Sequence, residues 1–251
     1  MNKYRQRENN LYQPGSQNPF RISRSKIDLF LQCPRCFYLD RRLGLGRPSL
    51  PGFALNSAVD QLLKNEFDLL RQNGQVHQLM KKYQIEAVPF KHPDLPVWRD
   101  DHYQFVGACV LEPKTNLEIC GIIDDVWVNQ NEELLMVDYK STSTSKEISL
   151  EDEYKQAYKK QMEVYQWIFR KKGFKVAKTG YFVFANAGRN RPQFDGRLEF
   201  ELTIIPYQGD DSWLEPTLSE IKKCLESEQI PAASQNCEYC EYRRLIGEKT
   251  G

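Results

Sequence analysis

The 251-residue sequence lacks several features that mark common classes of protein. No apolar run approaches the ~20 residues that a helix needs to cross a bilayer, so we expect no association with a membrane. The N-terminal stretch is polar and lacks the apolar core of a signal peptide, which favours a cytoplasmic protein. Lys and Arg total 35 and Asp and Glu total 34, so any nucleic-acid site must be a local basic groove on a nearly neutral protein.

Two further absences concern nucleotide and metal chemistry. The chain has no G-x-x-x-x-G-K-[ST] loop, so an ATP-driven helicase working with it would be a separate protein. Its three histidines are scattered without the spacing of metal ligands, and we assign them no role.

The order of periodic segments predicts an α/β fold. Residues 1–20 are polar and aperiodic and are expected to form a flexible tail, and residues 21–251 are expected to form one domain. Apolar residues at helical spacing predict helices, and short apolar runs between polar turns predict strands. The predicted helices are a short one before Pro34 and longer ones over 54–73, 151–172 and 211–227; the predicted strands cover 103–112, 117–128, 133–141, 178–186 and 197–205.

One predicted strand ends in an acid and a base. Residues 134–137 are apolar on both faces, and Asp138 and Lys140 follow on one face while Tyr139 points to the other. A three-residue loop over 130–132 would place Asp124 opposite Asp138. Two carboxylates suit magnesium or manganese, and a lysine beside them can stabilise charge on a phosphate. Taken alone, the same pattern also fits an ordinary Asp–Lys pair at the rim of a core.

Short motifs follow one another in a fixed order: a helix, a strand with "GIID", a strand with "VDYK" and a helix with "QMEVY". This order resembles the PD-(D/E)XK nuclease superfamily, specifically its RecB-like branch. This resemblance implies a restriction-endonuclease-like core, in which a mixed central sheet is flanked by helices.

The resemblance also implies roles for individual residues. Asp124 and Asp138 become metal ligands, the Tyr139 carbonyl becomes a third ligand, and Lys140 becomes the catalytic lysine. Gln161 and Tyr165 contact the substrate or brace the site. This branch often has a metal-binding histidine on the upstream helix, where this chain has Asp60, and an aspartate there can still bind a hard cation.

Two Cys-x-x-Cys pairs lie near opposite ends of the chain, at Cys33 and Cys36 and at Cys237 and Cys240. Four thiolates in such pairs can close around one zinc ion or one 4Fe–4S cluster, so we expect a metal site that joins the terminal regions. Some RecB-like nucleases, among them CRISPR-adaptation exonucleases and helicase-linked nuclease domains, staple their ends with an iron–sulfur cluster. The resemblance therefore favours 4Fe–4S, with zinc as the alternative.

The other cysteines lie in apolar contexts and are interpreted as buried thiols: Cys109, Cys120 and Cys224.

The leading hypothesis is a Mg²⁺- or Mn²⁺-dependent deoxyribonuclease, acting as an exonuclease on single strands or ends. A separate helicase, or a CRISPR or repair protein, is a possible partner. The alternative is a metal-stapled nucleic-acid-binding subunit that cuts weakly or not at all. A third reading, ranked last, is a zinc-ribbon scaffold in which the "DYK" residues have no catalytic role.

Overall fold

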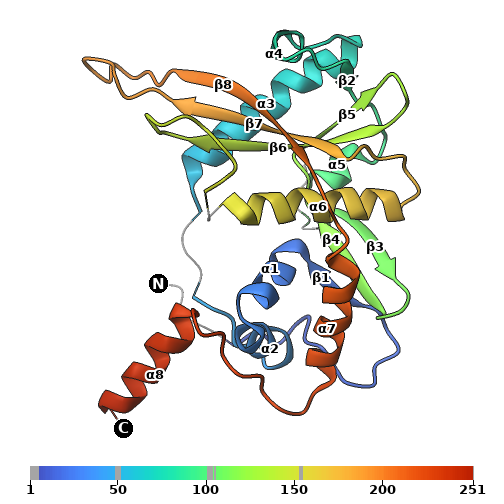
Figure 1. The fold of residues 1–251 in the computed structure, drawn as a ribbon, viewed down its shortest axis with the longest axis vertical. Helices are drawn as coiled ribbons and strands as arrows, with labels where there is room; N and C mark the ends of the chain where they lie inside the picture. The colour runs from blue at the N-terminus through green and yellow to red at the C-terminus, as the bar shows by residue number, and fades with distance from the viewer. Residues whose placement is uncertain (1–5, 49–51, 101–103, 105, 153–154, 251) are drawn as a thin grey trace. The chain divides into compact units, whose positions relative to one another are not determined.

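The computed structural model describes residues 6–48, 52–100, 104, 106–152 and 155–250. By its internal contacts the chain divides into two units, each of which is described by itself (Figure 1). The central unit comprises residues 52–108 and 121–211, and the terminal unit comprises residues 1–51, 109–120 and 212–251. That residues 21–251 form a single domain, and that residues 1–20 form a flexible tail, stay predictions.

The central unit is built on a five-stranded mixed sheet of order β2-β5-β6-β7-β8. Three of its neighbouring pairs, β2–β5, β5–β6 and β7–β8, are antiparallel, whereas β6 and β7 run parallel and are joined through helix α6 (Gln156–Lys171). A parallel pair needs such a crossover, because a short turn cannot bring the chain back to the same end of the sheet. The strands are β2 (Ala87–Pro89), β5 (Asp125–Asn129), β6 (Leu134–Thr142), β7 (Thr179–Ala187) and β8 (Phe200–Gln208).

Helices cover both faces of this sheet (Figure 1). Helix α3 (Ala54–Asn73) packs the apolar side chains of Val59, Leu63 and Phe67 on one face, where Tyr139 also points. Helix α6 (Gln156–Lys171) lies on the other face, where Gln161 bonds to Asp138. The short helices of this unit are α4 (Gln78–Lys82) and α5 (Leu95–Trp98). The predicted fold class, a mixed sheet flanked by helices, is confirmed.

Most predicted elements are present, with boundaries that follow local signals. Helix α3 ends at Gly74, whose φ of 61° is the left-handed conformation that a glycine allows without cost. Pro34 ends the first predicted helix and occupies the first turn of the next, as its missing N–H permits. Residues 153 and 154, in the predicted helix 151–172, lie outside the described residues, and α6 begins at Gln156.

The single strand predicted over 117–128 is wrong, because the chain bends between Gly121 and Asp125. Strand β4 (Leu117–Gly121) ends there and β5 begins in a different sheet. In the bend, the N–H of Ile123 donates to the Trp98 carbonyl at 3.1 Å, and the Ile122 carbonyl accepts from the Tyr165 hydroxyl at 2.5 Å. These partners replace the ladder bonds that a continuous strand would make.

The terminal unit contains a three-stranded sheet of order β1-β4-β3, with β1 parallel to β4. Fully buried Ile27, Phe37 and Leu218 belong to three of its helices and contribute to its core. The strands are β1 (Phe20–Ser23), β3 (Ala108–Glu112) and β4; the helices are α1 (Arg24–Gln32), α2 (Pro34–Arg42), α7 (Leu214–Glu226) and α8 (Glu238–Thr250). Within the first twenty residues, Tyr12 is buried and its hydroxyl contacts Glu226 of α7.

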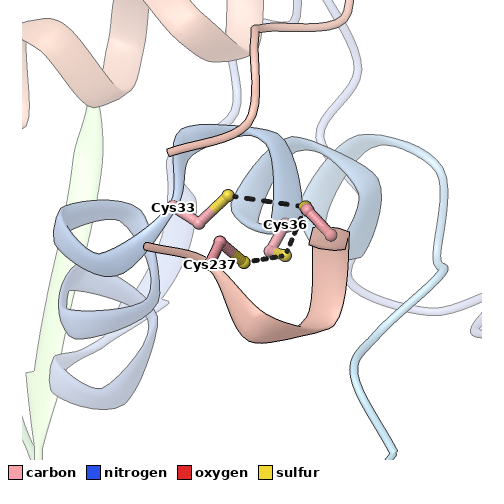
Figure 2. A group of neighbouring side chains, drawn as sticks. Cys33, Cys36 and Cys237 are labelled. Atoms are coloured by element: carbon pink, nitrogen blue, oxygen red, sulfur yellow. Dashed lines mark hydrogen bonds between the residues drawn. The ribbon is translucent and has the colours of Figure 1, made fainter. Parts of the chain in front are cut away.

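Six of the seven cysteines, all in the terminal unit, fall into two groups. Cys33, Cys36, Cys237 and Cys240 gather with their sulfur atoms all within 4.8 Å of one another, as the two Cys-x-x-Cys pairs predict (Figure 2). Cys109 and Cys120, predicted as buried thiols, instead form a disulfide, so that prediction is wrong. They lie on the neighbouring strands β3 and β4 with their Cα atoms 4.2 Å apart, which is close enough for a bridge. Cys224 is a free thiol, as predicted, but it is only partly buried, so the prediction of a buried thiol is wrong in that respect.

Among the described residues, no helix combines the length and the hydrophobicity that crossing a bilayer requires.

Replacing Phe67 tests the core between α3 and the sheet. Its ring is fully buried and stacks on Trp127 at 5.4 Å and on His77 at 4.8 Å. Phe67→Ala is expected to lower the free energy of unfolding by about 3–5 kcal/mol, because it leaves a cavity. Leu69→Ala on the exposed face of the same helix should change it by less than about 0.5 kcal/mol. Urea denaturation of both variants measures the difference, and similar losses would contradict this packing.

Candidate active site

The carboxylates of Asp124 and Asp138 meet because of the register of β5 and β6. Asp125 pairs with Val137 and Val128 pairs with Leu134, so Asp124 comes opposite Asp138 one step further along the strands. At the other end, Asn129 N–H donates to the Glu133 carbonyl, which closes the predicted three-residue loop over 130–132. The register predicted from the loop length is therefore confirmed.

The bend before β5 fixes the position of the Asp124 side chain. Its Oδ2 accepts a hydrogen bond of 2.8 Å from the backbone N–H of Tyr139. The carboxylate thus accepts from a β6 backbone N–H at the position just before β5 begins. Moving it away would leave this buried N–H without an acceptor. Asp124 lines a cavity of about 300 Å³ together with Asp60, Lys140, Tyr158 and Gln161.

Asp138 is fully buried and is held by two partners. Its Oδ1 accepts a 2.8 Å hydrogen bond from Gln161 Nε2, and its Oδ2 forms an ion pair with Lys140 Nζ. Oδ2 accepts no hydrogen bond of proper geometry from the described residues, although it is buried. A buried carboxylate oxygen whose partner is a single ammonium group can also bind a metal ion.

Gln161 and Tyr165 brace Asp138 from helix α6. Gln161 Nε2 lies 2.9 Å from the Tyr165 hydroxyl, which in turn donates to the Ile122 carbonyl. Gly121, the glycine of the "GIID" motif, lies against this tyrosine, and a Cβ there would come within 2.6 Å of the ring. The chain of contacts therefore runs from the bend before β5 through Tyr165 and Gln161 to Asp138.

Lys140 is nearly buried, with its Nζ 4.8 Å from the centre of the Tyr158 ring. Burial alone would lower the pKa of Lys140, but the carboxylates of Asp138 and Asp124 raise it, so the ammonium stays charged. Burial, and then the nearby Asp138 carboxylate, raise the pKa of Asp124 to about 6. The facing carboxylates of Asp124 and Asp138 therefore repel each other. Lys140 only partly offsets the electrostatic free energy that holding them together costs.

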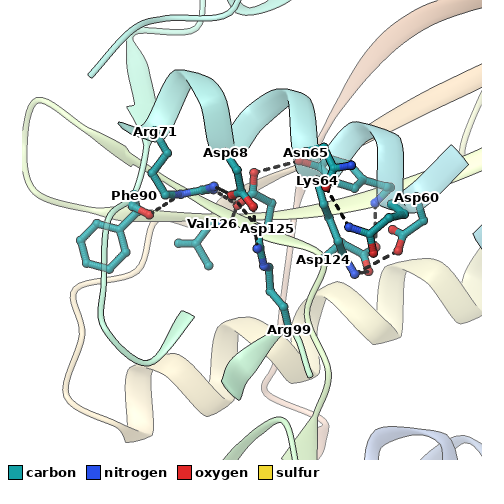
Figure 3. A network of polar contacts seen from close by, with 12 residues as sticks. Asp60, Lys64, Asn65, Asp68, Arg71, Phe90, Arg99, Asp124, Asp125 and Val126 are labelled. Carbon is teal, nitrogen blue, oxygen red and sulfur yellow. Dashed lines mark hydrogen bonds and ion pairs between the residues drawn. The ribbon is translucent and has the colours of Figure 1, made fainter. Parts of the chain in front are cut away.

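Helix α3 adds the predicted acid Asp60 and a base, Lys64, that the motifs do not reveal (Figure 3). Asp60 lies at the cavity, and burial followed by the Asp124 charge raises its pKa. Lys64, one turn later, pairs with Asp60 at 2.9 Å and lies 4.0 Å from Asp124 Oδ1. Lys64 was not among the predicted site residues, although its spacing of four from Asp60 is the signal of an ion pair on a helix.

A second network lies behind the site and links α3 to β5 and β6 (Figure 3). Asp125 is fully buried; its Oδ2 accepts from the Tyr139 hydroxyl at 2.8 Å and its Oδ1 pairs with Arg71. Arg71 also contacts Asp68, which receives two hydrogen bonds of 2.9 and 2.8 Å from Arg99. Of the two adjacent aspartates, Asp124 thus faces the cavity and Asp125 ties β5 and β6 to α3.

The structure therefore brings Asp60, Asp124, Asp138, Lys140, Gln161 and Tyr165 into one site, as the sequence predicts. Tyr139 contributes its backbone there, while its side chain points into the core on the other face, as predicted. The roles of these residues as metal ligands and catalytic groups stay predictions.

Comparison with known proteins identifies the class. The model of the PD-(D/E)XK nuclease superfamily matches residues 54–245, so the chain belongs to this superfamily. Membership implies metal-dependent nuclease activity on nucleic acid. Among solved structures, the crystal structure of SSO0001 is similar at 15% identity and a TM-score of 0.40, over 95% of this chain and 90% of that one. A search of curated proteins finds no match.

A change at Gly121 tests the bracing of the site. Gly121→Ala would place a methyl group against the Tyr165 ring, and either the ring or the bend must shift. We expect a loss of about 1–3 kcal/mol in the free energy of unfolding from overpacking. Gly52→Ala, where a Cβ meets nothing within 4 Å, is the matched control and should be nearly neutral. Equal stability of both variants in urea denaturation would contradict the contact.

The raised pKa of Asp124 predicts how stability depends on pH when divalent metal is removed with EDTA. The unfolded chain releases this proton near pH 3.9, whereas the folded chain keeps it until about 6. The folded state therefore loses stability as the pH rises through this window. Asp124→Asn should be more stable than the wild type above pH 6, and the difference should shrink toward pH 4.

Denaturation curves at several pH values measure this difference. Asp94→Asn, at an exposed carboxylate, is the control and should follow the wild-type pH profile. If the stabilities of the wild type and of Asp124→Asn depended on pH in the same way, the pKa of Asp124 would not be raised in the folded protein.

Proposed function

We propose that this protein is a Mg²⁺- or Mn²⁺-dependent deoxyribonuclease of the RecB-like branch, acting as an exonuclease on single-stranded DNA or DNA ends. The observation that carries the proposal is the convergence of three carboxylates and one lysine: Asp60, Asp124 and Lys140 line one cavity. The third carboxylate, the fully buried Asp138, forms an ion pair with Lys140. The preference for DNA and for ends rests on the resemblance to RecB-like exonucleases, as does the idea that a separate helicase, CRISPR or repair protein supplies the substrate.

The donor set at the cavity fits a hard divalent cation. Asp124 and Asp138 would hold it, with Asp60 and the Tyr139 carbonyl as further oxygen donors. Oxygen ligands without a thiolate or imidazole favour Mg²⁺ or Mn²⁺ over softer metals. When bound, such a cation polarises a phosphate and lowers the pKa of a coordinated water.

The protein's own residues supply position and charge. Gln161 fixes the rotation of the Asp138 carboxylate through its 2.8 Å hydrogen bond, and Tyr165 fixes Gln161. Lys140 keeps its proton because of the neighbouring carboxylates, so it presents a positive charge where negative charge develops on the phosphate. Tyr158 lies under the ammonium and restricts it to the cavity.

Cleavage assays with matched variants test the proposal. End-labelled linear single-stranded DNA, linear duplex and circular single-stranded DNA are incubated with Mn²⁺ or Mg²⁺. The wild type should degrade linear single strands and leave circles intact. Asp138→Asn and Lys140→Met should lower the rate by about 10²-fold or more, since each removes a charge at the reacting phosphate. The exposed controls Asp94→Ala and Lys175→Ala should retain wild-type rates.

Three outcomes would contradict parts of the proposal. Equal cleavage by the wild type and by Asp138→Asn would point to a contaminating nuclease. Cleavage of circles would replace the exonuclease by an endonuclease. Binding of DNA without cleavage, measured by fluorescence anisotropy, would favour the alternative of a metal-stapled binding subunit.

A further inference from the structure

The two Cys-x-x-Cys pairs have the same local structure. Cys33 precedes helix α2 and Cys36 lies in its first turn, while Cys237 precedes α8 and Cys240 lies in its first turn. The carbonyl of each leading cysteine accepts the N–H four residues later, at 3.1 Å from Phe37 and 3.0 Å from Glu241. Both helices thus direct the positive ends of their dipoles at the sulfur atoms, which favours thiolates there.

The distances between sulfur atoms indicate what these thiolates can hold (Figure 2). Cys33 and Cys240 are 3.8 Å apart, and Cys36 lies 3.6 Å from both Cys237 and Cys240. A tetrahedral zinc ion with bonds of about 2.3 Å separates its four sulfurs by about 3.8 Å. A 4Fe–4S cluster places a cube of iron and sulfide between the thiolates, and it needs them much farther apart than this.

The surroundings of the four sulfurs favour a site of net negative charge. Arg47 Nη2 lies 3.4 Å from Cys237 Sγ, and its guanidinium lies 4.5 Å from the centre of the Tyr239 ring. One zinc ion with four thiolates carries a net charge of −2, which an adjacent guanidinium partly offsets. Arg47 thus approaches the group from the residues after α2 and also contacts α8.

Helix α8 gives the group a structural role. None of its residues is buried, and its large apolar side chains are exposed: Tyr239, Tyr242, Leu245 and Ile246. A helix of 13 residues without a buried face is marginal in water. Within the described residues, α8 is held at its start by the cysteines and the Arg47–Tyr239 contact. Further along, Tyr242 and Arg243 line a cavity with Leu39 and Leu45.

We propose that the four cysteines hold a single tetrahedral zinc ion, in place of an iron–sulfur cluster, and that this ion holds α8 to the rest of the terminal unit. Because metal binding requires the folded arrangement of both pairs, binding energy at this site acts as folding energy for α8. The inference does not depend on nuclease activity and can fail or succeed independently of it.

Composition of the purified protein tests the identity of the ion. The full chain is purified without oxygen from cells supplied with both iron and zinc, and zinc, iron and acid-labile sulfide are measured. One zinc per chain, without sulfide and without a visible absorption band, is expected. Four irons and four sulfides per chain with a visible band would overturn the proposal, as would a chain without bound metal. Cys240→Ser should lose the zinc, whereas the matched control Cys224→Ser should retain it.

Hydrogen exchange tests the role of the ion. Removing zinc with a chelator should raise exchange rates in α8 by about tenfold or more, because the helix frays once its anchor is lost. The rates in α7, which buries Leu214, Leu218 and Ile221, should stay unchanged. Unchanged protection of α8 after zinc release would show that packing rather than the ion fixes this helix.

Discussion

The site depends on holding like charges close together. Asp124, just before β5, lies opposite Asp138 within β6, and Asp60 reaches the cavity beside Asp124 from α3. The mutual repulsion of these carboxylates opposes folding. Two lysines make the arrangement possible: Lys140 beside Asp138 and Lys64 between Asp60 and Asp124. Three acids against two bases leave one excess negative charge at the site, which attracts a divalent cation.

Helix α3 connects stability with function. Its face with Leu63 and Phe67 belongs to the core under the sheet, while Asp60 and Lys64 lie at the cavity. Arg71, near its end, reaches the buried Asp125. Any change that rotates this helix would therefore disturb the core, the cavity and the buried ion pair together, since one rigid element carries all three.

Much of the site could be predicted from sequence because its signals are local. The alternation along "VDYK" determines which side chains share a face, and the three-residue loop determines the register that brings Asp124 to Asp138. The spacing of four between Gln161 and Tyr165 places both on one side of α6, where they contact each other. These features require only strand period, helix period and loop length.

The features that were missed depend on partners distant in sequence. The bend after Gly121 is stabilised by hydrogen bonds with Trp98 and Tyr165. The apolar sequence of the predicted strand 117–128 contains no signal that predicts it. The disulfide between Cys109 and Cys120 requires knowing that β3 and β4 are neighbours. Helix α8 has no buried face, so its sequence lacks the periodic apolar pattern on which helix prediction relies.

The connectivity of the two units has a practical consequence for dissecting the protein. Residues 109–120 interrupt the central unit, so trimming both ends cannot isolate it. The backbone at Gly107 nevertheless lies directly against that of Gly121, since a Cβ on Gly107 would come within 2.5 Å of the Gly121 carbonyl oxygen. A short linker between Gly107 and Gly121 could therefore replace the segment that contains residues 109–120. Combined with trimming of both ends, it would leave a smaller protein that keeps the carboxylate cavity and lacks the four-cysteine group.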